Sequence, residues 1–463
     1  MKNRCLRRVR QNNGSLILTA AISAAVVVIL VGGMLTYVSN EYKLNIRSHK
    51  WTQSLALGEA GVDMAFTEFN NFYSAGSNGF SSSRGWREDD GVYSRSVDTF
   101  LNPQGENVGV IRAEVRRVGS LNPYIFSSGG CKLSASSTTY IYRGIECRLA
   151  NSAQFPAGMV AKGGIDMNGN NVTTDSYNSL YTSKSTNGKY DSTKKQANGD
   201  IATNATITNS TISAGNANIY GTSYTGPSGS VSLGPTGVIG PTFTSPATTV
   251  AAAIAAGWVR NDFAASIPDV TLPSGAASWS SQGSILNSAA LSAGSYQVTE
   301  ISLNGNNTLT IDGNVKIYIT GSAGIGLNGN GQIVINSGGS LTIYSAGNMD
   351  IGGNGIVNYN STSGDSAALH AQFYGLDTCT SVNLHGNADW VGLVYAPYAA
   401  LSLGGGGSSG EMSGAVVVNT IGMNGHVNFH YDEMLRTSGP NSSYNIASWK
   451  SYRYMSGTWV ADN

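Results

Sequence analysis

The sequence predicts a mainly β protein that starts with one long helix. We expect a transmembrane and amphipathic α-helix, then a small β-sheet, then a right-handed parallel β-helix. Three observations predict this order. A charge-free apolar run follows a basic N-terminus, alternating strands follow the helix, and an apolar-x-Gly-Asn phrase recurs later in the chain. A length of 463 residues is sufficient for two or three domains.

The composition excludes one large class of function. Only 12% of the residues are charged, against roughly 25% in ordinary globular domains. Lys and Arg together number 27, as do Asp and Glu, so the formal net charge is zero. Because nucleic-acid binding needs a positive surface, we expect no nucleic-acid partner.

The N-terminus predicts a membrane anchor. Residues 1–14 form a basic leader without acidic residues, and residues 15–38 carry no charge. At roughly 1.5 Å per residue, such a helix crosses a ~30 Å hydrocarbon core. The basic flank predicts a single pass through the inner membrane, with the N-terminus cytoplasmic and the bulk of the chain exported. A cleaved secretory signal is the alternative, but its apolar core spans only about 7–15 residues.

The membrane helix is expected to continue into an amphipathic half. Residues 15–72 contain no proline, and apolar side chains recur on one helical face. Residues 73–155 then alternate between apolar and polar, which predicts a small β domain. Cys131 and Cys147 flank a predicted strand–turn–strand there. A disulfide between them is a hypothesis, worth about 3 kcal/mol for a loop of that size.

This N-terminal region resembles the type IV pilin-like proteins, and among them the PilX-like minor pilus-assembly proteins. The resemblance is carried by the leader ending in NNG, the SLILTAAIS that follows, and the segment ALGEAGVDMAFTEF. It implies that a prepilin peptidase cuts after Gly14 and leaves Ser15 as the first residue. It also implies other pilin-like subunits as partners.

One departure from that family concerns the fifth mature position. Most pilins carry a glutamate there, whereas this chain has Thr19, and this points away from a major filament subunit. A plain membrane anchor with a coiled stalk is the alternative interpretation of the same helix.

Residues 156–435 are predicted to form the parallel β-helix, with loop insertions near residues 177–200 and 221–280 and a C-terminal tail at 436–463. From Gly305 onward, the glycines of the recurring phrase are 24, 24, 33, 19 and 20 residues apart, a spacing typical of solenoids. The predicted turn glycines are Gly169, Gly305, Gly329, Gly353, Gly386, Gly405 and Gly425.

Apolar positions recur with the glycines. The aligned sets are Ile301, Ile325 and Met349; Leu303, Leu327 and Ile351; Leu309, Ile333 and Val357; Ile311 and Ile335; Ile317 and Leu341; and Ile319 and Ile343. Within a unit they alternate with polar residues, which predicts about three short strands per coil with one buried face. An antiparallel sandwich is the alternative, but it does not account for the common spacing.

The later segments also resemble a known module. GNADWVGLVYAPYAALSLGGGG, MSGAVVVNTIGMNGHVNFHYDEML and NGNNVTTDSYNS are similar to the C-terminal β-helix module attached to PilX-like N-termini in environmental bacteria. That module has no established activity, so the resemblance implies an architecture rather than a reaction.

No catalytic residue and no cofactor are predicted. A polysaccharide lyase needs a base and acidic calcium ligands, yet Lys316 is the only Lys or Arg between Ile301 and Tyr431. A glycoside hydrolase needs two carboxylates roughly 5–9 Å apart. The aspartates of the repeat are scattered along the sequence, at Asp312, Asp350, Asp365, Asp377 and Asp389. A polysaccharide-active lyase or hydrolase is therefore the alternative function rather than the expected one.

No metal site is predicted either. His426 and His430 are four residues apart, about 13 Å along a strand, which is too far to share one ion unless a turn intervenes. Val357 stands where calcium-binding nonapeptide repeats carry an aspartate. The cluster HYDE at residues 430–433 is expected to close the last coil by hydrogen bonding.

The expected function is structural or adhesive. The resemblance implies a minor component of a type IV pilus or a related pseudopilus. The chain contains 23 tyrosines, and tyrosines on a solenoid face suit a surface that binds carbohydrate or protein.

Overall fold

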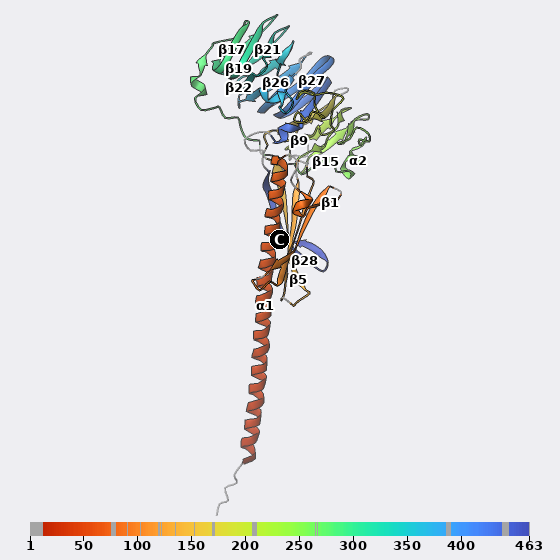
Figure 1. Cartoon of the computed structure of the whole chain (residues 1–463), viewed down its shortest axis with the longest axis vertical. Helices are drawn as coiled ribbons and strands as arrows, with labels where there is room; N and C mark the ends of the chain where they lie inside the picture. Colours follow the sequence, from red (N-terminus) through yellow and green to blue (C-terminus); the bar gives the residue numbers. More distant parts are fainter. Residues whose placement is uncertain are drawn as a thin grey trace, which may run out of the picture.

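The computed structural model describes residues 13–462, apart from 76–79, 90, 102, 119–120, 122, 135, 152, 169–171, 206–210, 264, 266, 386–389 and 438–443. Most of the predicted leader and the turn glycines Gly169 and Gly386 therefore lie outside the described residues. One long helix leads into an antiparallel sheet, and a large body of parallel strands lies beyond the C-terminal end of the helix (Figure 1).

Helix α1 spans Asn13–Ala75, 63 residues in one piece. Its N-terminal half extends away from the rest of the molecule (Figure 1), and the side chains from Leu16 to Val38 are exposed. This half is long and apolar enough to cross a membrane, with a mean hydropathy of 2.6. The C-terminal half packs on the sheet and buries Val62, Ala65 and Phe69. The single helix with two different halves agrees with the sequence-based expectation.

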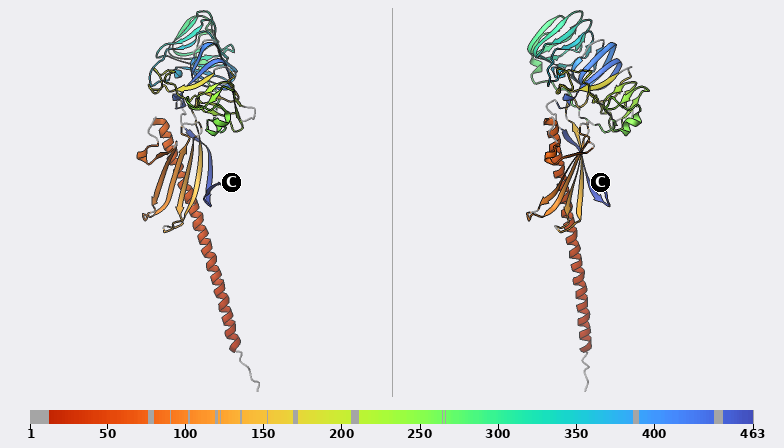
Figure 2. Two further views of the ribbon diagram at one scale, coloured as in Figure 1. Left: turned by 90° about the vertical axis from the view of Figure 1, so that its right-hand side faces the viewer. Right: turned by 45° about the vertical axis from the view of Figure 1, so that its right-hand side comes forward.

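The sheet beside α1 has seven strands in the order β1-β2-β3-β4-β5-β28-β29 and is antiparallel throughout (Figure 2). The 3₁₀ turn η1 (Ser82–Arg84) precedes it. Its strands are β1 (Arg87–Asp89), β2 (Val92–Leu101), β3 (Asn107–Arg116), β4 (Tyr124–Lys132), β5 (Tyr140–Asn151), β28 (Tyr444–Met455) and β29 (Thr458–Ala461).

The last two strands come from residues predicted to be a tail. β28 pairs with β5, beginning at Tyr444 opposite Asn151. The chain therefore leaves the sheet and returns to it at neighbouring points, and the intervening residues form an insertion between two adjacent strands. A C-terminal clasp fixes the return: Asp462 forms an ion pair with Arg143, whose guanidinium lies 4.4 Å from the ring centre of Trp51 on α1.

The predicted disulfide is wrong. Cys131 and Cys147 are both free and buried. Cys131 lies opposite Ile141 near the turn of the β4–β5 hairpin, whereas Cys147 lies opposite Ile125 near its far end. Six residues of strand separate the two positions, roughly 20 Å, because both strands extend much further from the turn than the sequence interpretation assumed.

The insertion contains two arrays of short strands. The first array, which also contains helix α2 (Val250–Ala255), comprises β6 (Met159–Ala161), β7 (Ile165–Asp166), β8 (Thr173–Tyr177), β9 (Ile201–Thr203), β10 (Thr211–Ala214), β11 (Asn218–Ile219), β12 (Ser223–Tyr224), β13 (Ser230–Leu233), β14 (Val238–Ile239) and β15 (Val259–Arg260). Residues 178–200 form turns that connect β8 to β9, as predicted, whereas residues 221–280, also predicted to be a loop, contain strands and α2.

The second array includes the 3₁₀ turns η2 (Ala276–Ser278), η3 (Ala367–His370) and η4 (Glu433–Thr437). Its strands are β16 (Ser280–Ser281), β17 (Ala289–Val298), β18 (Ile301–Leu303), β19 (Thr308–Ile319), β20 (Ile325–Leu327), β21 (Gln332–Ile335), β22 (Ser340–Ser345), β23 (Met349–Ile351), β24 (Gly355–Asn358), β25 (Ala371–Gly375), β26 (Ser381–His385) and β27 (Trp390–Asp432). Strands three apart pair in parallel, as in β20–β23, β21–β24 and β22–β25, so one coil holds three strands.

The inward positions form aliphatic ladders. Two sets of three residues pair in register and are buried: Ile301, Ile325 and Met349, and Leu303, Leu327 and Ile351. Parallel pairing with alternating burial excludes the antiparallel sandwich for these coils. Three predicted turn glycines, Gly305, Gly329 and Gly353, have φ values of 64°, 63° and 61°. Gly425 has φ 84°, and Gly405 lies within β27.

Three of the predicted ladder sets are out of register. Ile317 pairs with Ile343 rather than with Leu341, so Ile319 does not meet Ile343. The turn between β21 and β22 is longer than the bend inside β19, and this adds two residues to the coil. Ile333 pairs with buried Ile356, and Val357 lies on the outward side. A fixed 24-residue spacing therefore holds only for the strands around the Asn-Gly turns.

The two arrays join in an order that differs from the chain order. The last coil pairs in parallel with the first, with Val416 opposite Met159 and Asn428 opposite Thr173. We call this junction of β27 with β6, β7 and β8 the seam. The first array runs away from the seam. The described part of the connection to β16 then passes the second array, with residues 267–271 beside Tyr344, Tyr374 and Tyr395, and β16 pairs with β17 at the opposite end of the stack. Figure 1 shows the resulting continuous row from β17 through β27 to β9 and β15.

Candidate functional site: a tyrosine groove and the seam

One outward position of the coils carries a tyrosine on successive turns. Tyr318, Tyr344, Tyr374 and Tyr395 pair in register on β19, β22, β25 and β27. Their strand neighbours point inward and are buried, so the tyrosines lie on the outward face of the coils, where Tyr395 is nevertheless covered and only 4% exposed. The rings of Tyr344 and Tyr374 stack with centroids 5.2 Å apart, and Tyr374 and Tyr395 are 6.3 Å apart.

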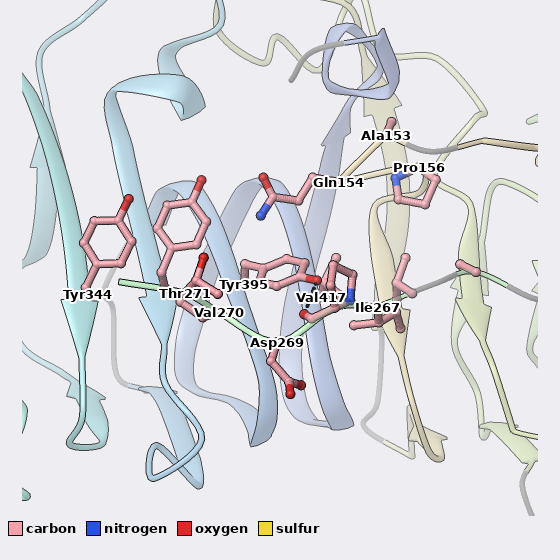
Figure 3. Close-up of a pocket in the computed structure, with 14 residues that line it drawn as sticks. Ala153, Gln154, Pro156, Ile267, Asp269, Val270, Thr271, Tyr344, Tyr395 and Val417 are labelled. Atoms are coloured by element: carbon pink, nitrogen blue, oxygen red, sulfur yellow. Dashed lines mark hydrogen bonds between the residues drawn. The ribbon is translucent and has the colours of Figure 1, made fainter. Parts of the chain in front are cut away.

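Three of these tyrosines form the floor of a groove of about 410 Å³ (Figure 3). One wall is the segment that enters the first coil, with Gln154 and Pro156. The other wall is residues 267–271, which we call the strap, part of the connection between the two arrays. The Tyr395 hydroxyl donates a hydrogen bond to the Pro268 carbonyl oxygen at 2.7 Å and holds the strap in place.

The groove offers neutral polar groups. Burial raises the pKa of the Tyr374 hydroxyl to about 12 and also raises the pKa of Tyr344. Both phenols are therefore uncharged hydrogen-bonding groups at neutral pH. Among the described residues that line the groove, Asp269 is the only charged one. Its carboxylate accepts a hydrogen bond from Tyr398 at 2.7 Å and lies 4.0 Å from the Lys162 ammonium group.

The HYDE cluster lies at the seam rather than in a cleft. His430 is directly opposite Asp175 of the first coil, with its Nδ1 2.5 Å from the carboxylate. Tyr190 stacks on His430 at 3.5 Å and donates to the same carboxylate. Glu433 accepts hydrogen bonds from Ser176 and Asn198. The cluster closes the last coil by hydrogen bonding, as expected, and its partner is the first coil.

Asp432 is the most buried carboxylate of the cluster, and it predicts a pH dependence of stability. One oxygen accepts hydrogen bonds from the backbone N–H groups of Ser179 and Met434. Burial nevertheless raises the pKa of Asp432 above its ordinary value. A group with a raised folded-state pKa stabilises the fold most below its unfolded-state pKa. That contribution is lost as the pH rises through the folded-state pKa.

We therefore expect the free energy of unfolding of Asp432→Asn at pH 8 to exceed that of the natural chain by about 1 kcal/mol. The free energy of unfolding of the variant should also change less with pH. The amide keeps one oxygen for Ser179 and Met434 and removes the cost of ionisation. Urea titrations of both proteins between pH 4 and pH 8 measure this, with Asp312→Asn, at an exposed position, as the matched control. If the free energy of unfolding changes equally with pH in all three proteins, the raised pKa of Asp432 does not govern the pH dependence.

The aspartates considered for hydrolysis have separate surroundings where the structure describes them. Asp350 contacts His385 at 3.2 Å, Asp365 contacts His370 at 2.7 Å, and Asp312 is exposed. Asp389 lies outside the described residues, and Lys316 is exposed. The described residues contain no group of three or more His, Cys, Asp or Glu side chains that could hold a metal ion. This arrangement does not favour the polysaccharide-active enzyme.

Sequence reasoning missed the groove, although a weak pattern marks it. The triplets IYS, FYG and VYA end at Ser345, Gly375 and Ala396, each with the tyrosine in the middle. Their spacings are unequal because turns of different length separate them, so a search at constant period does not align them. The predicted processing residues Gly14 and Ser15 lie in the first turn of α1.

Comparisons with known proteins give three findings. Residues 272–438 match the family model described as a domain of unknown function, DUF7305, and this span coincides with the second array. No curated protein matches the chain. Among solved structures, the chain is similar to the competence-associated pilin ComZ from Thermus thermophilus, with 10% identity, a TM-score of 0.29, and coverage of 87% of this chain and 98% of that one. A TM-score at that level does not establish a shared fold.

Proposed function

We propose that this protein is an exported, membrane-anchored, minor-pilin-like component of a type IV pilus or a related pseudopilus, of the PilX-like kind. Its insertion is a right-handed parallel β-helix that displays an adhesive surface. The observation that carries this proposal is the position of the insertion between β5 and β28. The coil stack thereby lies at the opposite end of the molecule from the apolar half of α1 (Figure 1).

The contacts between helix and sheet support a rigid mount for this display. Gly129 of β4 lies directly against Ser54 and Gly58 of α1, and the Ser54 hydroxyl donates to the Ile141 carbonyl at 2.7 Å. The clasp between Asp462, Arg143 and Trp51 adds a contact from the returning chain. Force on the coil stack would pass through two neighbouring strands into a sheet that α1 holds along its length.

The anchoring half of α1 has the side chains expected for packing in a membrane. Its exposed residues are aliphatic, and removing them from water favours a lipid surface or neighbouring apolar helices. We propose the inner membrane as the location before assembly, with the N-terminus cytoplasmic, and other pilin-like subunits as partners.

Fractionation of cells tests the proposal. We expect sheared surface filaments to contain the protein with Ser15 as its first residue, as read by mass spectrometry of the N-terminal peptide. Gly14→Leu should leave the full-length chain in the membrane fraction, because a bulky side chain occupies the cleavage position. Gly33→Ala, within the same helix at a position with open space, is the matched control and should be processed. A protein that is never found in filaments, and that retains Met1, would sink the proposal.

A further inference from the structure

We propose that the tyrosine groove binds an extended, uncharged polysaccharide chain that lies over Tyr344 and Tyr374 and ends at the strap that covers Tyr395. This inference rests on the proposed function, since it names the ligand class of the displayed surface. The inference is supported by three features that lie together in a groove of about 410 Å³: the row of tyrosines, the Gln154 amide and the strap. That volume lies within the range of ordinary ligand sites.

The spacing of the tyrosines along the groove floor fits a linear polymer. Paired strands are about 4.8 Å apart, and the groove floor carries one tyrosine per coil, with ring centres 5.2 Å apart between Tyr344 and Tyr374. The ring faces of Tyr344 and Tyr374 already stack on each other. A ligand therefore meets hydroxyl groups and ring edges, whose partial positive charge attracts oxygen atoms. One pyranose ring of an extended glycan has nearly the length of one coil spacing, so neighbouring sugars can lie over neighbouring coils.

The charge of the groove favours a neutral glycan. A polyuronate or another polyanion would need basic side chains at intervals along its length, and the part of the lining that the structure describes contains none. Asp269, the single charge, would repel an anion. The Lys162 ammonium group lies 4.0 Å from the Asp269 carboxylate, so the negative charge of Asp269 offsets the positive charge of Lys162. Sugar hydroxyls can both donate to and accept from the Gln154 amide and the tyrosine hydroxyls.

A peptide strand fits the floor less well than a glycan does. Strand addition needs an unpaired sheet edge, whereas the backbone of β25 is paired on both sides, to β22 and to β27. The two-residue repeat of a peptide strand is roughly 6.6 Å, so side chains on one face would lose register with a ladder of about 4.8 Å. The strap is bound through Tyr395 and Tyr398 at the edge of the row, so it does not occupy the hydroxyls of Tyr344 and Tyr374. The Tyr374 hydroxyl donates to the Gln372 side chain at 2.9 Å, and its oxygen can still accept a hydrogen bond from a sugar hydroxyl.

Titration calorimetry on the full-length chain tests the inference. The protein is held in a detergent without sugar head groups, and the probes are cellohexaose, hexagalacturonate and a peptide with the strap sequence IPDVTLP. We expect binding of cellohexaose, and at least a 10-fold weaker response to the anionic hexamer and to the peptide. No filament is needed, so absence from filaments would overturn the proposed function and leave the groove assignment standing.

Variants assign the binding to the groove. Tyr374→Ala should weaken cellohexaose binding by about 10-fold, and Tyr344→Phe, which keeps the ring and the fold, by a few-fold. Tyr359→Ala, an exposed tyrosine outside the groove, should bind as the natural chain does. The inference is overturned if hexagalacturonate or the peptide binds more tightly than cellohexaose. It is also overturned if cellohexaose does not bind, or if Tyr374→Ala and Tyr344→Phe both bind it unchanged.

Discussion

Gly129→Ala should lower the free energy of unfolding of the helix–sheet unit by about 3 kcal/mol. A Cβ atom at residue 129 would lie 2.2 Å from the Ser54 carbonyl oxygen and 2.5 Å from the Gly58 backbone nitrogen. Both are main-chain atoms of α1, so no side-chain rotation relieves the overlap. The helix must move away from β4, which disturbs the packing of Val62, Ala65 and Phe69 in the core below.

Hydrogen exchange of the full chain in micelles measures this effect locally. We expect faster exchange in α1 beyond Ser54 and in β4, with the coil stack unchanged. Gly326→Ala is the matched control, because it adds the same methyl group to a strand glycine with open space around it. Equal exchange in the two variants would show that α1 does not require the close approach.

Asp200→Ala should destabilise the coil stack by about 3–5 kcal/mol. Asp200 lies 2.8 Å from the guanidinium of Arg436, and their side chains are only 7% and 12% exposed. Asp200 also accepts a hydrogen bond from the backbone N–H of Thr222 at 2.8 Å. Removing the carboxylate takes from the buried Arg436 guanidinium the counter-charge that Asp200 provides, and it loosens the end of the second array from the first.

Urea unfolding at pH 7 gives the size of the effect. The double variant Asp200→Leu with Arg436→Met should recover most of the loss, because two apolar side chains replace both charges. Asp312→Ala, on an exposed part of the stack, should change stability by less than about 0.5 kcal/mol. If Asp200→Ala is as stable as Asp312→Ala, Asp200 and Arg436 do not hold the two arrays together.

Some of the fold followed from local pattern. The helix was predictable because its apolar run and its amphipathic continuation are both contiguous in sequence. The coils around Gly305, Gly329 and Gly353 were predictable because turns of constant length keep Ile301, Ile325 and Met349 at one spacing. The spacing failed at Ile317 and at Val357, where turn length changes, since a strand register depends on the whole path between two strands.

The groove was harder to predict than the coils. Tyr344, Tyr374 and Tyr395 are separated by unequal numbers of residues, and the strap that forms one wall comes from between the arrays. The position of the strap depends on where the connection between the two arrays crosses the coil stack. The missing disulfide has a similar cause, because the lengths of β4 and β5 place Cys131 and Cys147 near opposite ends of one hairpin.

The long helix, the glycine turns and the inward aliphatic rows follow from the sequence alone, since each depends on residues close together in the chain. Tertiary packing sets the order of the coils, the pairing of Asp175 with His430 across the seam, and the return of β28 to the side of β5. These pairings join segments hundreds of residues apart. Many edges of short parallel strands are chemically alike, and burial and polar pairing across the whole molecule determine which of them pair.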